Sequence, residues 1–207
     1  MMRQGQHILL VGSTGSGKTT LAQKILSMRQ YNIAILTKPD TMTWPHPWRM
    51  VRTADRIRPS GEKREWFALR PELSKQYNEV ETALRNVWVE GGWLIYIDEM
   101  YYIQHKLRLT NTVEDLLTQG RSHFITVMIG VQRPSWVTRF AISEPSHIFA
   151  SRLHDERDIK TMGMIAGMSW AESLRDLERY EFSYLNRDTM ESTIVNRDTV
   201  FDVIGKR

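Results

Sequence analysis

Eight residues near the amino terminus have the types and the spacing needed to hold a polyphosphate. Residues 12–19 read Gly-Ser-Thr-Gly-Ser-Gly-Lys-Thr, which matches the phosphate-binding loop pattern G-x-x-x-x-G-K-[ST] at every fixed position. Several backbone N–H groups must converge on the phosphates, and glycines permit the tight turn that this requires. We therefore predict a nucleotide site made of Gly12, Ser13, Thr14, Gly15, Ser16, Gly17, Lys18, Thr19 and Thr20.

The neighbouring residues give this motif its expected context. The apolar run at residues 7–11 predicts a strand, and residues 19–28 carry apolar side chains at helical spacing. The amino end of that helix would add its positive dipole to the phosphate site. We expect Lys18 to contact the β- and γ-phosphates of ATP and the Thr19 hydroxyl to bind Mg²⁺. A flexible Gly/Ser loop is the alternative, but it does not require a strand, this loop and a helix in that order.

Two carboxylates follow a second apolar run. Residues 93–97 predict a buried strand, and Asp98 and Glu99 come directly after it. In P-loop NTPases an Asp at this place holds the Mg²⁺ shell, and a neighbouring Glu can accept a proton from the attacking water. We assign Asp98 to the metal and Glu99 to catalysis as the base. Alone, the pair would be a common exposed acidic pair. After a full P-loop it favours a hydrolase over a small-molecule kinase, which usually lacks this Glu.

A polar residue also follows the predicted strand at residues 124–131, which ends in Gln132-Arg133-Pro134-Ser135. If this strand lies beside the P-loop strand, the Gln132 amide can hydrogen-bond the γ-phosphate or the attacking water. A local partner at the junction of strand and loop is an equal alternative on spacing alone.

Strands and helices alternate along the chain, which predicts an α/β fold: a P-loop NTPase of the ASCE/RecA-like class, with a mainly parallel sheet flanked by helices on both faces. Further strands are expected at residues 32–37, 66–69 and 147–150. Further helices are expected from Pro71 to the stop at Gly91-Gly92, with Leu73 and Tyr77 on the apolar face, and at residues 112–120 and 155–166.

The carboxyl-terminal part has weaker patterns. Residues 169–172, Ser-Trp-Ala-Glu, resemble a capping box that starts a helix. Tyr180, Phe182 and Tyr184 alternate with polar residues, which predicts a half-buried edge strand. Residues 199–204 are expected to form another strand or a tail.

An irregular excursion is expected at about residues 38–71. It holds Pro39, Pro45, Pro47, Pro59 and Pro71, together with Trp44, Trp48, Arg49, Arg52, Arg56 and Arg58. Basic residues beside exposed aromatics could contact nucleic acid. A surface insertion whose Trp residues cover the sheet edge is equally compatible with the sequence.

Composition sets broader limits. The 207 residues are enough for one P-loop ATPase domain spanning residues 1–207. The net charge is +4 and Arg outnumbers Lys, which fits a nucleic-acid partner without requiring one. The chain has no Cys, and no apolar run predicts membrane insertion. The amino terminus does not resemble a signal peptide, so we expect a cytoplasmic protein.

Four features, in this order, resemble the FtsK/HerA superfamily of DNA-pumping ATPases. They are the loop at residues 12–19, the run at residues 94–99, Gly120-Arg121 before the next strand, and Gln132-Arg133-Pro134-Ser135 after it. The Gln-Arg-Pro ending is the most specific, since P-loops and Asp-Glu pairs occur in many families. In that family the Arg of the Gly-Arg pair acts on a neighbouring subunit's nucleotide. The resemblance therefore implies that Arg121 is a catalytic arginine finger; pairing with the dipole of the preceding helix is its structural alternative.

The chain is most similar to the compact viral genome-packaging ATPases of that superfamily, since we expect no membrane anchor, added amino-terminal domain or winged-helix tail. This resemblance implies an ATP- and Mg²⁺-dependent motor that moves double-stranded DNA into a preformed capsid. The implied partners are DNA, a homo-oligomeric ring (hexamer or pentamer) and a capsid vertex protein, in the host cytoplasm or with the virion. Two alternatives remain: a nucleotide or small-molecule kinase, and a nucleotide-gated assembly switch.

Overall fold

A computed structural model describes residues 2–38, 44–58, 61 and 64–205. Within them the chain forms a nine-stranded sheet with the order β3-β4-β2-β5-β6-β1-β7-β8-β9. The strands in that order are β3 (Arg49–Val51), β4 (Glu65–Leu69), β2 (Tyr31–Ile35), β5 (Leu94–Ile97), β6 (Thr126–Val131), β1 (Ile8–Val11), β7 (His147–Ala150), β8 (Phe182–Asn186) and β9 (Glu191–Val195). Strands β3 to β7 in this order are parallel, and β8 and β9 are antiparallel. The mainly parallel sheet is confirmed.

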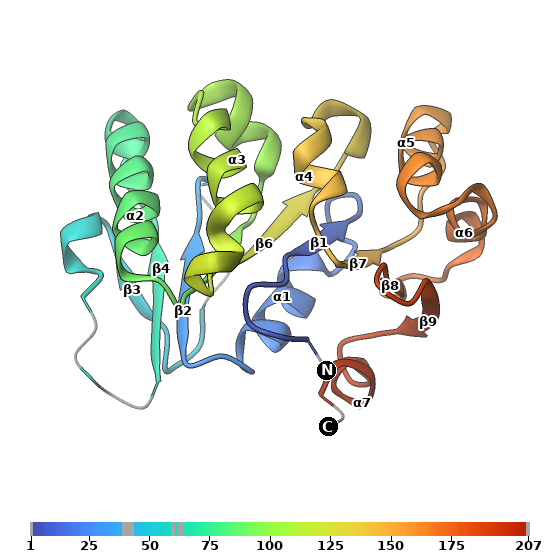
Figure 1. Ribbon diagram of the computed structural model, residues 1–207, viewed down its shortest axis with the longest axis horizontal. Coiled ribbons are helices and arrows are strands. Elements are labelled where there is room, and N and C mark those ends of the chain that lie inside the picture. Colours follow the sequence, from blue (N-terminus) through green and yellow to red (C-terminus); the bar gives the residue numbers. More distant parts are fainter. Residues whose placement is uncertain (1, 39–43, 59–60, 62–63, 206–207) are drawn as a thin grey trace.

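Helices cover both faces of this sheet (Figure 1). One face carries α2 (Gln76–Glu90), α3 (Thr110–Gln119), α4 (Arg139–Ser143), α5 (Glu156–Ala166) and α6 (Met168–Ser173), and the other carries α1 (Lys18–Leu26) and α7 (Val200–Ile204). Side chains of β1 alternate between the two layers, because successive residues of a strand point to opposite faces. Leu9 and Val11 join the core under α2 to α6, and Ile8 and Leu10 join the core under α1 and α7. No helix in the described part of the chain is long and apolar enough to cross a bilayer.

The start of α2 differs from the prediction. Pro71 precedes the helix, residues Leu73–Lys75 form a 3₁₀ turn, and the α-helix begins at Gln76. Leu73 thus lies before the α-helix and Tyr77 in its first turn, and neither is on the buried face: they are 78% and 47% exposed. The expected stop is confirmed, since the helix ends at Glu90 and Gly91 follows with a positive φ of 68°.

The carboxyl-terminal predictions need three corrections. The strand predicted from Tyr180, Phe182 and Tyr184 begins at Phe182 and is not an edge strand, because β8 pairs with β7 and β9. Residues 199–204 form neither a strand nor a tail: Thr199 is the N-cap residue of helix α7, and Val200 and Ile204, about one helical turn apart, pack into the core beside α1. Ser169 is no cap: it lies inside α6, which follows Gly167.

The excursion is partly ordered by aromatic packing. Trp44, Trp48 and Trp66 are buried; the Trp48 ring contacts both of the others, and Trp44 also contacts Tyr96 of β5. These Trp side chains cover the sheet rather than face solvent, which favours the insertion alternative for the aromatic residues. The excursion also adds the unpredicted edge strand β3. Pro39 and Pro59 lie outside the described residues.

Candidate functional site

The predicted phosphate loop connects β1 to α1 at the carboxyl edge of the parallel strands. Gly15 and Gly17 have φ values of 78° and 94°, which side-chain-bearing residues rarely adopt. Lys18, the first residue of α1, donates from Nζ to the carbonyl oxygens of Gly12 at 2.5 Å and Ser13 at 2.9 Å. Burial lowers the Lys18 pKa to about 8, and the charges of Asp98 and Glu99 oppose that shift. The amine therefore lies over the phosphate loop.

A hydroxyl and a carboxylate meet beside this loop. Thr19 Oγ1 donates to Asp98 Oδ1 at 3.1 Å, and Tyr96 Oη donates to the same oxygen at 2.6 Å. Burial, reinforced by the Asp98 charge, raises the Tyr96 pKa well above its usual range, so Tyr96 remains a donor. Gly130 of β6 lies against the Asp98 backbone, where a Cβ would collide with the Asp98 carbonyl. Asp98 is thus held in place from two sides.

The Thr19–Asp98 pair has the chemistry that Mg²⁺ requires. Mg²⁺ prefers hard oxygen ligands and is usually held by one or two carboxylates together with substrate phosphates. Within the described residues no group of three or more His, Cys, Asp or Glu side chains could hold a metal by itself. The predicted ligands therefore fit a metal that is bound together with a nucleotide.

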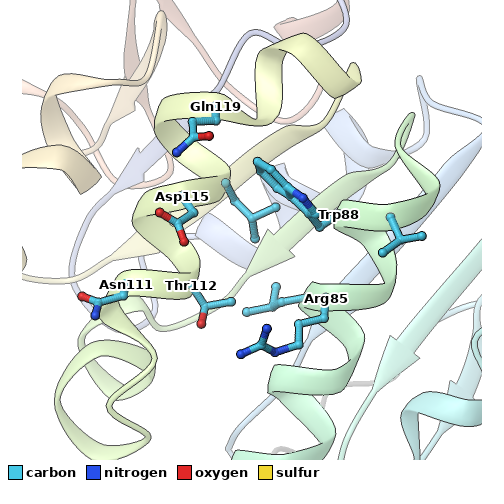
Figure 2. A pocket seen from close by; sticks show the side chains of 9 residues that line it. Arg85, Trp88, Asn111, Thr112, Asp115 and Gln119 are labelled. Carbon is cyan, nitrogen blue, oxygen red and sulfur yellow. The ribbon is translucent and has the colours of Figure 1, made fainter.

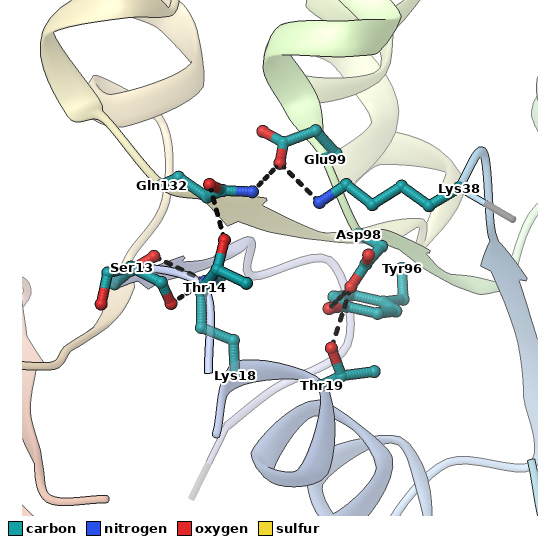
Figure 3. Close-up of polar contacts among 10 residues, drawn as sticks. Ser13, Thr14, Lys18, Thr19, Lys38, Tyr96, Asp98, Glu99 and Gln132 are labelled. Atoms are coloured by element: carbon teal, nitrogen blue, oxygen red, sulfur yellow. Dashed lines mark hydrogen bonds and ion pairs between the residues drawn. The ribbon is translucent and has the colours of Figure 1, made fainter. Parts of the chain in front are cut away.

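Glu99 and Gln132 belong to a single network of polar contacts (Figure 3). Gln132 Nε2 donates to Glu99 Oε2, and Gln132 Oε1 accepts from Thr14 Oγ1 at 3.1 Å. Strand β6 lies between β1 and β5, which is why Gln132 reaches both the phosphate loop and the carboxylate. Residues that follow three neighbouring strands are therefore linked beside the phosphate loop.

Lys38 also takes part in this network of polar contacts, and the sequence analysis missed it. Its Nζ lies 2.9 Å from Glu99 Oε2, in an ion pair with a Glu99 side chain that is 10% exposed. Lys38 follows β2, and β2 is the other neighbour of β5. Its position at the end of a buried apolar run was the available signal, but it became meaningful only with the strand order.

Arg121 is the predicted site residue that the structure does not bring to this cluster. It lies in the 3₁₀ turn Gly120–His123, before the amino end of β6, whereas Gln132 follows the carboxyl end. Arg121 packs near Gly5 and His7 at the opposite edge of the sheet. Arg133, which follows Gln132 in the Gln-Arg-Pro motif, forms ion pairs with Asp155 at 2.5 Å and with Asp158 at 2.7 Å.

Two depressions that share Tyr180 lie beside the phosphate loop. A cavity of about 500 Å³ extends from Gly15, Lys18 and Thr19 to Asp98 and Gln132. A second cavity, of about 460 Å³, lies on the other side of Tyr180, between the start of α1, Phe182 and residues 196–198. Tyr180 borders both, has a strained positive φ of 68°, and carries the Arg179 guanidinium 4.7 Å from its ring centroid.

A groove of about 560 Å³ between α2 and α3 is lined by different chemistry (Figure 2). Its polar residues include Arg85, which is paired with Glu81 at 2.8 Å, and Asp115. The described residues that line it include neither the phosphate loop nor the Asp98–Glu99 pair, so the candidate nucleotide site is the smaller cavity at the carboxyl edge.

Comparison with known proteins decides the family. No protein family model matches the chain. Over 170 residues it is 32% identical to the DNA packaging ATPase P9 of Enterobacteria phage PRD1, across 78% of this chain and 70% of the phage protein. The chain belongs to the family of viral DNA packaging ATPases. Structural matches support the fold of this packaging ATPase, and its assignment as an ATP-hydrolysing enzyme is confirmed.

The genome packaging NTPase B204 of Sulfolobus turreted icosahedral virus 2, in complex with AMP, matches with a TM-score of 0.74 and 15% identity, over 93% of this chain and 98% of that one. The pCW3 conjugation coupling protein TcpA matches with a TM-score of 0.62 and 15% identity, over 93% and 60%. EssC from Geobacillus thermodenitrificans matches with a TM-score of 0.61 and 10% identity, over 94% and 39%. These structural matches confirm the mainly parallel α/β P-loop fold of this packaging ATPase.

Proposed function

We propose that this packaging ATPase is a motor that uses ATP hydrolysis to move double-stranded DNA into a preformed capsid. The observation that carries the proposal is the meeting of Lys18, Asp98 and Glu99 at one sheet edge. The phage relative, named as a DNA packaging ATPase, supports DNA as the substrate. In this proposal the protein acts in the host cell and contacts a capsid vertex protein.

We propose that Lys18 and the backbone of the phosphate loop bind the β- and γ-phosphates of ATP. Thr19 and Asp98 would hold a Mg²⁺ ion, which would neutralise charge that develops on the phosphates. Because Asp98 and Glu99 lie on the β5 side of the loop, the γ-phosphate would point toward β5 and the nucleoside toward β8. The Tyr180 ring lies on that second side and offers a face for the base.

We propose that Glu99 activates the attacking water and that Gln132 orients it. A general base must lie within hydrogen-bonding reach of the proton that it accepts. Glu99 Oε2 accepts a hydrogen bond from the Gln132 amide, and Gln132 in turn contacts Thr14 of the phosphate loop. The lone pairs of Glu99 that now face Lys38 must turn toward the water, so the Lys38 ion pair has to loosen before the chemical step.

We propose that Arg121 completes the site of a neighbouring subunit. It lies at the opposite end of β6 from Gln132, and six residues at about 3.3 Å each separate those ends by roughly 20 Å. Such a separation prevents contact with the nucleotide of its own subunit. A ring in which the Arg121 edge of one subunit faces the phosphate loop of the next would meet this requirement, whether it is a hexamer or a pentamer.

The function is tested by comparing ATP turnover with and without duplex DNA, for the wild type and for Glu99→Gln. We expect turnover that rises with DNA in the wild type, and a variant that binds ATP but hydrolyses it at least about a hundredfold more slowly. Stimulation by a small acceptor in place of DNA would identify a kinase. ATP binding without DNA-stimulated turnover would identify an assembly switch. Normal turnover by Glu99→Gln would refute the assignment of the base.

A further inference from the structure

Beyond Glu99, three neighbouring parallel strands lead into basic side chains. Arg52 follows β3, Arg70 follows β4, and Lys38 comes shortly after β2. These strands are adjacent in the order β3-β4-β2, and β5 with its two carboxylates comes next. Backbone hydrogen bonds continue past the strand ends, from Arg70 N to the Val51 oxygen at 2.9 Å. The sheet edge therefore carries a row of cations that adjoins the catalytic carboxylates.

The three cations line one cavity of about 440 Å³, together with Thr37, Met50 and Leu73. No Asp or Glu is among the described residues that line it. The nearby carboxylate of Glu72 lies 3.8 Å from Arg52, but the two side chains are 54% and 79% exposed, so this pair contributes little. The cavity has an excess of positive charge.

Among the three cations, Arg70 is the one with buried side-chain nitrogens that lack hydrogen-bond partners within the described residues. These nitrogens are Nε and Nη2. A buried donor without a partner is costly, and a buried guanidinium is more so. By contrast, Arg49 in the same excursion contacts Glu65 at 2.6 Å and the Phe67 ring. Arg70 also lines the cavity, and the planar fork of donors on its guanidinium matches a phosphate.

We propose that this cavity binds a backbone phosphate of the translocated DNA. The inference rests on the proposed function. The lining of the cavity favours a phosphodiester over a free anion. Met50 and Leu73 are exposed apolar side chains at the cavity wall, and they suit the sugars on either side of a phosphate. A motor must also hold DNA without reading its sequence, and contacts to phosphates meet that need.

Lys38 connects this cavity to the nucleotide site. The same ammonium group borders the cavity and binds Glu99 Oε2. A phosphate that enters beside Arg70 competes with Glu99 for the Lys38 charge. Binding of DNA would then release Glu99 to accept a proton from water, so the site provides a physical route by which DNA increases hydrolysis.

The test measures affinity for a short duplex as a function of salt concentration, with a non-hydrolysable ATP analogue present. The variant is Arg70→Gln, and the control is Arg157→Gln, an exposed cation on α5. We expect Arg70→Gln to weaken binding about tenfold and to reduce the slope of the log–log salt plot by about one. Arg157→Gln should change neither beyond a small effect of net charge. Arg70→Gln should keep the thermal midpoint of the wild type, because the guanidinium that it removes has no partner.

Each other outcome overturns the inference in a distinct way. Equal affinities and slopes for the two variants would exclude Arg70 from the DNA site. Loss of inorganic phosphate binding with unchanged DNA affinity would identify a site for free phosphate. Altered sedimentation of Arg70→Gln with unchanged DNA affinity would identify a contact with a neighbouring subunit's carboxylate. A wild-type protein that binds no DNA would refute the proposed function as well, which separates the two failures.

Discussion

The proposed role of Arg121 in the site of a neighbouring subunit makes a quantitative prediction. Arg121 lies at the amino end of β6 and Gln132 at the carboxyl end, so roughly 20 Å of strand separates the finger from its own nucleotide. Arg121→Ala should therefore bind ATP with nearly wild-type affinity. It should hydrolyse ATP about 10³- to 10⁵-fold more slowly, which is the usual effect of losing an arginine finger.

Mixing two inactive variants tests the geometry directly. Lys18→Ala has a defective phosphate loop and an intact finger, and Arg121→Ala has the reverse. In a ring assembled at random from equal amounts, about a quarter of the boundaries join an intact loop to an intact finger. Steady-state ATPase activity should then recover to a corresponding fraction of wild type. A finger that acts on its own nucleotide gives no recovery, because every site carries one defect. A mixture that stays inactive while mixed rings are detected by native mass spectrometry would refute the trans assignment.

Two further predictions concern nucleotide binding. The Lys18 pKa of about 8 in the folded protein is below its ordinary 10.5 because the amine is buried. ATP affinity measured by calorimetry should therefore fall as the pH rises through about 8, and Lys18→Arg should move that fall to higher pH. Between those two pKa values the unfolded chain binds more protons than the folded protein, so the contribution of Lys18 to stability increases with pH there. Tyr180→Ala should weaken ATP binding several-fold while leaving tripolyphosphate binding unchanged. Tyr180→Phe should bind ATP as the wild type does, because the ring face and not the hydroxyl would contact the base. Equal losses of ATP and tripolyphosphate affinity in Tyr180→Ala would contradict that role.

The parts of the site that the sequence predicted are those held within one continuous segment. The phosphate loop has its turn, its cation and its helix within residues 12–20, and Asp98 and Glu99 directly follow the strand that positions them. Gln132 was left open because its value depends on which strands flank β6. Lys38 was missed for the same reason: a lysine after an apolar run has no meaning until β2 is known to lie beside β5.

The errors in the fold also have physical causes. Leu73 and Tyr77 fit a helical apolar stripe, but Leu73 precedes the α-helix, which begins at Gln76, and Tyr77 lies in its first turn beside the buried stripe that starts at Gln76 and Val80. Strand β9 has Ser192, Thr193 and Ile194 exposed on the outer edge of the sheet, so it lacks the buried alternation that marks a strand. Its pairing with β8, and not its own pattern, determines its conformation.

The order of the strands places the candidate hydrolysis site and the proposed DNA site on one sheet edge. From β3 to β1 the strand ends present Arg52, Arg70, Lys38, the Asp98–Glu99 pair, Gln132 and the phosphate loop. Each group neighbours the next, so a change at the basic end can reach the γ-phosphate through Lys38, Glu99 and Gln132 alone. No movement of the sheet is required. A conformational signal that bypassed these side chains would leave DNA stimulation intact in Lys38→Met, whereas the chain of contacts predicts that this variant responds to DNA weakly or not at all.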